Sequence, residues 1–270
     1  MQQKNVNFPQ ALELAAEIIG LEKSSFNLQI KPPFGGFYKK ILKQQREPEL
    51  EITTYPTELL DEYKNKLSLQ FFRDGINFET QEKYQIGVDF STMRVAIPQW
   101  TFDGRLCGIM GRSIDKDIPH EERWFPIIPC QKSYTLFGYH QNYSKIQEKG
   151  MCIVFESEKA VCQLDSFGCY LGLATGGCRI SNTQAKYLKS LMIPRIILAY
   201  DEGLSEEQII EQAEKLKVGH LSSLLGGTTK IGYVWDDNNT YIPKDSKMNA
   251  ADMGKDKFTK LIKEKVRWLT

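Results

Sequence analysis

Residues 151–203 read MCIVFESEKAVCQLDSFGCYLGLATGGCRISNTQAKYLKSLMIPRIILAYDEG and decide the fold of this chain. Three short apolar runs, at 152–155, 170–174 and 196–200, each end in a polar or glycine-rich turn. They are too short for helices, and amphipathic segments long enough for helices separate them. Because strands that alternate with helices form parallel sheets, this stretch predicts an α/β fold with a parallel sheet flanked by helices.

Acidic side chains follow these strands at the point where each ends. Glu156 comes directly after the first run and Asp201 after the third, and a further run at 230–235 ends at Asp236. Because the carboxyl ends of parallel strands meet at one edge of a sheet, we expect the three carboxylates to lie together there. Clustered carboxylates repel one another unless a cation holds them, and their oxygens suit Mg²⁺ or Mn²⁺. A single acid at a strand end is more often a cap or turn residue, so only the cluster indicates a site.

Two further signals lie in the same region. Ser181 and Ser205 each precede a glutamine by three residues, which is capping-box spacing and predicts a helix start after each serine. Glu206 and Glu207 then fall in a first helical turn, where acids stabilise the helix dipole, so we do not expect them to bind a metal. Glu202 adjoins Asp201 in the preceding loop and is a candidate ligand.

The composition is that of a globular protein. The chain has 270 residues, a net charge of +1 and 41% hydrophobic residues, so any nucleic-acid surface must be a local patch. It has no apolar run of membrane-span length and no signal-peptide pattern at its start, which leads us to expect a cytoplasmic protein. Six cysteines without a Cys-x-x-Cys pair and three scattered histidines argue against a structural zinc site or a disulfide framework.

Basic residues gather upstream of the parallel sheet. Residues 94–112, RVAIPQWTFDGRLCGIMGR, predict two strands joined at Asp103-Gly104, with one face open to solvent or ligand. The guanidinium fork suits phosphate oxygens, although arginines on a sheet are more often simply solvated. The candidates for binding nucleic acid or nucleotide are Arg94, Arg105, Arg112, Arg123 and Lys132.

Together these motifs resemble a known family. Glu156 at a strand end, the ATGG segment at a second and Asp201 at a third resemble the TOPRIM domain of DnaG-type DNA primases, topoisomerases and some nucleases. The segments 94–112 and 122–141 (ERWFPIIPCQKSYTLFGYHQ) resemble the basic subdomain of the primases. In collinear order from Phe8 to Leu269, the chain is similar to a primase RNA-polymerase core without its zinc-binding and helicase-binding domains. Its short length and relaxed motifs resemble phage-encoded members.

This resemblance implies an enzyme that makes short RNA primers on single-stranded DNA from ribonucleoside triphosphates, with Mg²⁺ or Mn²⁺. It also implies a replicative helicase and a separate zinc-binding module as partners, and the host cytoplasm as the location. The implied catalytic residues are Glu156, Asp201 and Asp236. The implied metal ligands are these three and Glu202, and Asp245 and Asp252 match later acidic positions. The five basic residues named above would hold the template and the nucleotide.

The chain departs from the family pattern at three positions. Gly203 stands where the family has the second acid of Asp-x-Asp, and Ser157 and Ala160 replace a glycine and an aspartate after Glu156. Two alternatives therefore remain open. A TOPRIM nuclease would use the same acids for hydrolysis, although such nucleases lack the basic segment. A single-stranded-DNA-binding module that has lost catalysis would explain Gly203 and Ala160.

We expect four regions along the chain. Residues 1–50 would form an N-terminal helix, at 8–19, and a basic linker, and residues 51–149 the basic α+β subdomain. Residues 150–250 would form the TOPRIM metal-binding domain, and residues 251–270 a C-terminal helix. In that last helix Phe258, Leu261, Ile262, Val266 and Leu269 make one apolar stripe.

Overall fold

The parallel sheet forms where the apolar runs predict it. The structure is a computed structural model that describes residues 51–115, 117–119, 122–217 and 229–269, so the predicted helix at 8–19 and the basic linker lie outside the described residues. Its second sheet has the strand order β6-β5-β7-β8-β9, in which the first four strands are parallel. The strands are β5 (Met151–Phe155), β6 (Gly172–Ala174), β7 (Arg195–Leu198), β8 (Lys230–Val234) and β9 (Val266–Trp268).

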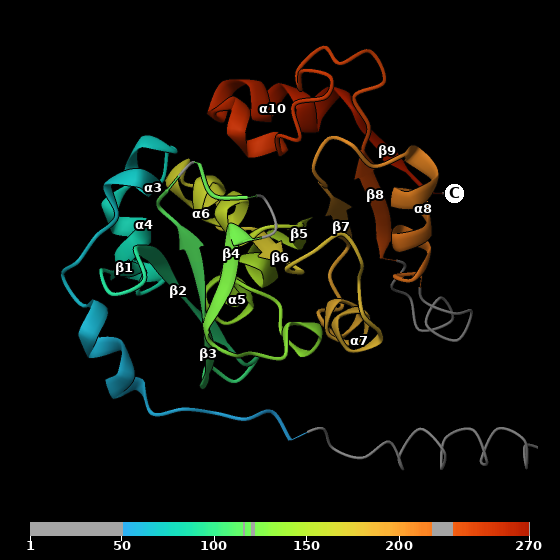
Figure 1. Ribbon diagram of the computed structural model, residues 1–270. Coiled ribbons are helices and arrows are strands. Elements are labelled where there is room, and N and C mark those ends of the chain that lie inside the picture. The colour runs from blue at the N-terminus through green and yellow to red at the C-terminus, as the bar shows by residue number, and fades with distance from the viewer. Residues whose placement is uncertain (1–50, 116, 120–121, 218–228, 270) are drawn as a thin grey trace, which may run out of the picture. The chain divides into compact units, whose positions relative to one another are not determined.

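Helices cover both faces of this sheet because its strand side chains alternate between two apolar cores. Ile153 and Phe155 of β5 pack in one core, whereas Cys152 and Val154 pack in the other. The first core also takes side chains from α6 (Glu158–Ser166), the 3-10 helix η5 (Ala250–Met253) and α10 (Lys255–Glu264). The second takes them from α5 (Tyr139–Lys149), α7 (Asn182–Ser190) and α8 (Glu206–Glu214). Figure 1 shows this arrangement.

The helix starts predicted from the capping boxes are confirmed. Ser181 and Ser205 are the N-caps of α7 and α8, and each side chain accepts a hydrogen bond from the backbone N–H of the glutamine three residues later. In both boxes the glutamine side chain reaches back to the N-cap backbone. Glu206 and Glu207 lie in the first turn of α8, as expected. None of the helices in the described part of the chain is long and apolar enough to span a membrane.

The first sheet is antiparallel and shares a core with the second. Its order is β1-β2-β3-β4, with strands β1 (Gly87–Asp89), β2 (Arg94–Trp100), β3 (Leu106–Ser113) and β4 (Trp124–Ile128). The β2–β3 hairpin turns at Asp103 and Gly104, and Gly104 has φ +81°, a conformation that favours glycine. Val95 and Ile97 of β2 lie in the same core as Phe155. Residues 52–270 therefore form one compact unit, and the predicted division at residue 150 stays a prediction.

Short helices complete the first half of the unit. The predicted helix after Pro56 is the 3-10 helix η2 (Thr57–Tyr63), with Pro56 rather than Thr57 at the N-cap. Leu60 and Tyr63 of η2 pack with Ala96 of β2, so the face of β2 that was predicted to be open is covered. The remaining helices are α3 (Leu69–Arg73), α4 (Phe78–Lys83) and the 3-10 helix η4 (Lys132–Tyr134).

The C-terminal segment differs from the single helix predicted for 251–270. α10 ends at Glu264, and Val266–Trp268 forms β9, which pairs with β8 in antiparallel register. The backbone N–H of Trp235 bonds to the carbonyl of Lys265 at 2.9 Å, which starts this pairing. The backbone groups at the edge of β8 need hydrogen-bonding partners. Pairing with β8 therefore decides the structure of Val266 and Leu269, although their spacing also suits the apolar stripe of a helix.

A buried ion pair joins α4, in the first half of this compact unit, to α6, in the second half. Lys83 Nζ of α4 lies 2.5 Å from Asp165 Oδ2 of α6, whose side chain is 0% exposed. Tyr84 Oη donates to the same oxygen at 2.9 Å, and the Asn142 amide donates to the other at 3.3 Å. Burial raises the pKa of Asp165, and Lys83 opposes that shift by stabilising the carboxylate.

Replacing Lys83 should therefore lower the free energy of unfolding. Lys83→Met leaves the Asp165 carboxylate buried without its cation, which should cost roughly 2–4 kcal/mol of unfolding free energy, measured by urea denaturation. Lys83→Met combined with Asp165→Asn should recover part of the loss, because no charge then remains to be buried. Lys145→Met is the control, since Lys145 pairs with Glu148 on the surface. Equal losses for Lys83→Met and the control would contradict this role.

Candidate active site

Parallel pairing of β5 with β7 brings two of the predicted acids together. Glu156 directly follows β5, and Asp201 lies in the loop after β7. Glu156 Oε1 accepts a hydrogen bond from the Asp201 backbone N–H at 3.1 Å. The two carboxylates therefore lie at one rim of the sheet, as the order of strands and turns predicts.

The electrostatics of this pair favour a bound cation. Burial, the Glu156 carboxylate and the Asp252 carboxylate raise the pKa of Asp201 to about 7, whereas Lys159 lowers it. Burial also raises the pKa of Glu156. Asp201 Oδ1 is buried and has no hydrogen-bond partner, although a buried carboxylate oxygen normally has one. An unpartnered oxygen beside a second carboxylate fits a hard divalent cation, so the residues present fit Mg²⁺ or Mn²⁺.

The third acid close to this pair is Asp252 of η5. Lys159 Nζ of α6 lies 2.5 Å from Asp252 Oδ1, and Gln163 Nε2 donates to the same oxygen at 2.9 Å. The Asn249 backbone and side chain both donate to Asp252 Oδ2. The sequence signal for Asp252 was only its match to a later acidic position of the resembled family, because the loop before η5 gives no strand-end pattern.

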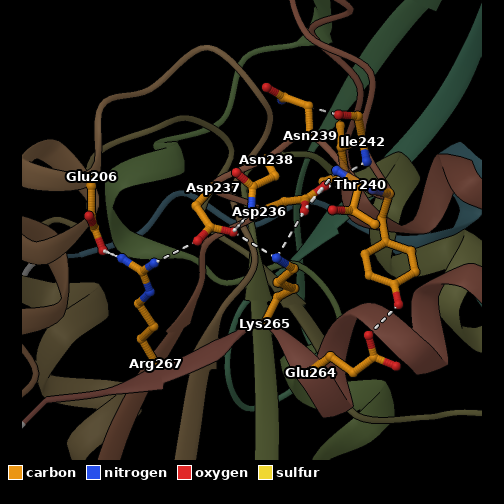
Figure 2. A network of polar contacts seen from close by, with 11 residues as sticks. Glu206, Asp236, Asp237, Asn238, Asn239, Thr240, Ile242, Glu264, Lys265 and Arg267 are labelled. Carbon is orange, nitrogen blue, oxygen red and sulfur yellow. Dashed lines mark hydrogen bonds and ion pairs between the residues drawn. The ribbon is translucent and has the colours of Figure 1, made fainter.

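Asp236, predicted as a ligand, is engaged by its own loop. It follows β8 at the same rim, but its carboxylate accepts backbone hydrogen bonds from Thr240 at 3.1 Å, from Tyr241 at 2.7 Å and from Ile242 at 2.9 Å. Figure 2 shows this carboxylate turned into the 240–242 loop, with Lys265 beside it. Figure 2 also shows Asp237 and Glu206 paired with Arg267 of β9, which ties the strand added at the edge to α8.

Glu202 has a similar structural task. Its two carboxylate oxygens accept the backbone N–H groups of Asp245 and Lys247 at 3.1 and 3.2 Å. Asp201, Glu202 and Asp236 line one open pocket of about 390 Å³. Within the described residues, however, no three His, Cys, Asp or Glu side chains are placed to hold one metal ion together. The structure thus brings Glu156 and Asp201 together and leaves Glu202 and Asp236 on the loops around them.

The positions that depart from the family pattern have distinct surroundings. Ala160 is fully buried in the core shared by the two sheets, so a carboxylate there would have to be buried. Gly203 has φ +117°, and a Cβ atom built on it would meet nothing within 4 Å. The rim is therefore open where the resembled family has an acid.

Two of the predicted basic residues lie near the acids, around one indole ring. The Arg112 guanidinium lies 5.5 Å from the Trp124 ring centre, and Lys132 Nζ lies 5.8 Å from it. Lys132 is also 3.7 Å from Glu158, the first residue of α6. Glu158, Arg123 and Asp252 all act electrostatically on Arg112. The ring contacts and the Glu158 contact place Arg112 and Lys132 on the side of the first sheet that faces α6.

Arg112 is more enclosed than a solvated arginine. Its side chain is 18% exposed and lies 3.7 Å from the Asp74 carboxylate, and its guanidinium is 5.7 Å from the centre of the Phe71 ring. Arg112 Nη1 and Asp74 Oδ2 both lack hydrogen-bond partners. Burial lowers the pKa of Arg112. The side chain of Arg112 is thus largely enclosed by its neighbours, whereas the side chain of Lys132 is more exposed to solvent.

Arg94 and Arg105 lie apart from this group. Residues paired across antiparallel strands share a face, and Arg112 pairs with Val95, so Arg94 points to the opposite face. There Arg94 donates to the carbonyls of Glu122 and Arg123 and lies over the exposed ring of Phe125. Arg105 is at the hairpin turn, at the other end of β3, and pairs with Asp103 on the surface. The structure therefore brings Arg112 and Lys132 together and places Arg94 and Arg105 elsewhere on the first sheet, and the binding roles of all five basic residues stay predictions.

In the absence of a divalent cation, the free energy of unfolding should depend on the ionisation of Asp201. The pKa of Asp201 in the folded protein, about 7, exceeds the unfolded value, so its contribution is favourable in acid and is lost as pH rises from about 4 to about 7. In EDTA at pH 8, Asp201→Asn should be more stable than wild type by roughly 1–3 kcal/mol, and at pH 4 the two should nearly agree. Urea unfolding measures both values. An equal difference in unfolding free energy between Asp201→Asn and wild type at pH 8 and pH 4 would contradict a raised pKa for Asp201.

Arg112 and Arg105 should differ in their effect on folding. Arg112→Met leaves the half-buried Asp74 carboxylate without its cation and should lower the unfolding free energy by roughly 1–3 kcal/mol. Arg105→Met, in an exposed pair, should change it by less than about 0.5 kcal/mol. Thermal or urea unfolding of both variants measures this, and a neutral Arg112→Met would show that the Asp74 contact contributes little.

Comparison with known proteins places this geometry in a known fold. No family model matches the chain. The SPbeta prophage-derived uncharacterized protein YorJ of Bacillus subtilis is 24% identical over 97% of this chain and 75% of its own length. The zinc-binding and RNA-polymerase domains of the Aquifex aeolicus primase superpose with a TM-score of 0.60 at 18% identity, over 97% of this chain and 68% of that one.

A second solved structure agrees. The DnaG primase catalytic domain bound to single-stranded DNA superposes with a TM-score of 0.53 at 16% identity, over 77% of this chain and 73% of that one. Both neighbours carry a mixed α/β fold of the kind described above. The chain therefore has the fold of the DnaG primase catalytic core.

Proposed function

We propose that this protein is a DNA primase core that synthesises short RNA primers on single-stranded DNA by metal-dependent nucleotidyl transfer. The observation that carries the proposal is the Glu156–Asp201 pair, two half-buried acids at adjacent strand ends in a fold shared with primase catalytic cores. A solved relative in fold binds single-stranded DNA, which supports a DNA template for this chain. The YorJ likeness, to a prophage-derived protein, supports a phage-like origin.

Each part of the site has a task in this reaction. Glu156 and Asp201 would hold Mg²⁺ or Mn²⁺, which supplies the positive charge that activates a primer 3′-hydroxyl and stabilises the pyrophosphate leaving group. Glu202 and Asp236 fix the loops around the pocket through backbone hydrogen bonds, so they keep the rim in shape. Lys132 lies beside Glu158 at the start of α6 with its positive charge, which suits the phosphates of a triphosphate or a template, and Arg123 keeps its predicted role in holding them.

The nuclease alternative uses the same acids. It differs in the nucleophile, which would be water attacking a phosphodiester. The antiparallel sheet and its basic residues favour the polymerase, because a hydrolase acting on bound DNA needs no second site for a triphosphate.

The third alternative, a binding module without catalysis, is favoured by Gly203, where the rim lacks a carboxylate. A replicative helicase and a zinc-binding module in trans remain part of the proposal as partners.

Ribonucleotide incorporation on single-stranded DNA separates these functions. The full chain is incubated with labelled ribonucleotides and Mg²⁺ or Mn²⁺, with and without an annealed RNA primer. We expect primer lengthening that falls at least about 100-fold in Glu156→Gln, because a neutral amide cannot hold the cation. The substitution keeps the acceptor for the Asp201 N–H, so the fold should survive.

The control is Glu148→Gln, which removes an exposed carboxylate near the end of α5, before the start of β5, whereas Glu156 follows the end of that strand. It should leave incorporation unchanged. Shortening of the DNA that disappears in Glu156→Gln would instead identify a nuclease. Tight DNA binding, with neither lengthening nor shortening on the primed template, would identify the binding module.

A further inference from the structure

The loop between β6 and α7 leaves its backbone N–H groups unused. This 176–179 loop reads Gly176-Gly177-Cys178-Arg179, and its last three residues are exposed. In the described part of the chain, none of its four N–H groups donates a hydrogen bond to another residue. Gly176 has φ +73°, a left-handed conformation that favours glycine. Successive free N–H groups around such a turn are the donors of anion-binding sites made by the backbone.

A fixed frame turns two of these N–H groups outward. The amide of Gln184, a buried residue of α7, donates to the carbonyl of Thr175 at 2.9 Å. The Thr175 hydroxyl donates in turn to the carbonyl of Gly177 at 2.6 Å. Because N–H and C=O point in opposite directions across a trans peptide, the N–H groups of Gly176 and Cys178 point away from these buried partners.

Lys132 lies against the same loop with its ammonium uncommitted. A Cβ atom built on Gly176 would be 3.1 Å from Lys132 Cδ, so the lysine stem lies over the glycine. Lys132 Nζ is 3.7 Å from Glu158, beyond hydrogen-bond distance, and it makes no hydrogen bond within the residues that the structure describes. Gln184 also donates to the Lys132 carbonyl at 3.0 Å, which ties this residue to the frame. Arg179 adds a second cation, which is exposed.

The loop adjoins the acid pair. The Thr175 N–H donates to the carbonyl of Phe155 at 3.1 Å, and Glu156 is the next residue in the chain. Tyr200, which precedes Asp201, is 5% exposed in the core that α7 covers, yet its hydroxyl is buried and has no hydrogen-bond partner. Buried polar groups normally have partners, so unused donors gather beside the carboxylates that would hold a divalent cation.

This arrangement suits a polyphosphate. Phosphate oxygens accept from backbone N–H groups and from lysine and arginine side chains. A triphosphate carries its charge on adjacent phosphates, so it can meet the loop and a cation at the neighbouring strand end together. We propose that the 176–179 loop and Lys132 bind the phosphates of the incoming ribonucleoside triphosphate. This inference rests on the proposed function and adds the segment that takes the nucleotide.

Binding of ATP with Mg²⁺ to the full chain, measured by calorimetry without DNA, tests the loop directly. Gly177→Ala is the probe, because its added methyl group meets no protein atom within 4 Å and its backbone needs no left-handed conformation. The methyl group would crowd a phosphate that approaches the N–H groups, so the dissociation constant should rise on the order of tenfold. Arg179→Gln removes a cation and should also raise it.

Two controls separate lost contacts from lost structure. Arg195→Gln should bind ATP as wild type does, since Arg195 is exposed at the start of β7, the end of the strand opposite the acids. The urea midpoint of Gly177→Ala should match wild type. If that variant does not fold, the affinity of Arg179→Gln decides.

A thymidine oligonucleotide titrated in parallel separates the two sources of phosphate. If the loop variants lower its affinity and leave that of ATP unchanged, the loop belongs to the template and the triphosphate assignment is overturned. A wild-type chain that does not bind ATP would also overturn the inference, as would loop variants that bind both probes like wild type.

These results are separable from failure of the proposed function, which the primer assay tests. Primer synthesis with an unchanged KM for ribonucleotides in Gly177→Ala would keep the function and remove the role of the loop. No primer synthesis, together with the predicted ATP affinities, would keep the loop and remove the function.

Discussion

The site depends on a repulsion between two like charges. Parallel pairing of β5 with β7 fixes Glu156 and Asp201 at neighbouring strand ends, where burial raises the pKa of each carboxyl. Such a pair of carboxylates does not stabilise the folded state. Without a bound cation, the protein would be more stable if these acids were absent or neutral. The apolar cores on both faces of the sheet supply the stability that this arrangement costs, and in the proposed function a cation would offset the repulsion by binding between the two carboxylates.

Much of the fold was predictable because its signals are local. Short apolar runs between turns predicted the parallel strands. A serine followed by a glutamine three residues later predicted the starts of α7 and α8. The C-terminal strand was not predictable, because Val266 and Leu269 continue a helical apolar spacing in the sequence. The hydrogen-bonding demand of the β8 edge, which is a tertiary property, decides their structure.

The site was predictable in part for the same reason. Sequence order places Asp236 at the rim, but it cannot show that three loop amides engage the carboxylate of Asp236. It also gave no pattern for the pairing of Asp252 with Lys159, which lie far apart in the chain. Among the basic residues, the sequence could not show that Arg105 lies at the opposite end of β3 from Arg112, or that Arg94 points to the opposite face of the sheet.

The central claim is that Glu156 and Asp201 share a divalent cation at the strand ends. Anomalous diffraction from crystals soaked in Mn²⁺ tests it most directly, because the signal locates the ion without reference to activity. We predict one anomalous peak within ligand distance of both carboxylates, at roughly 2.0–2.3 Å from their oxygens. Glu156 and Asp201 carboxylates that face apart, with no peak between them, would contradict the claim.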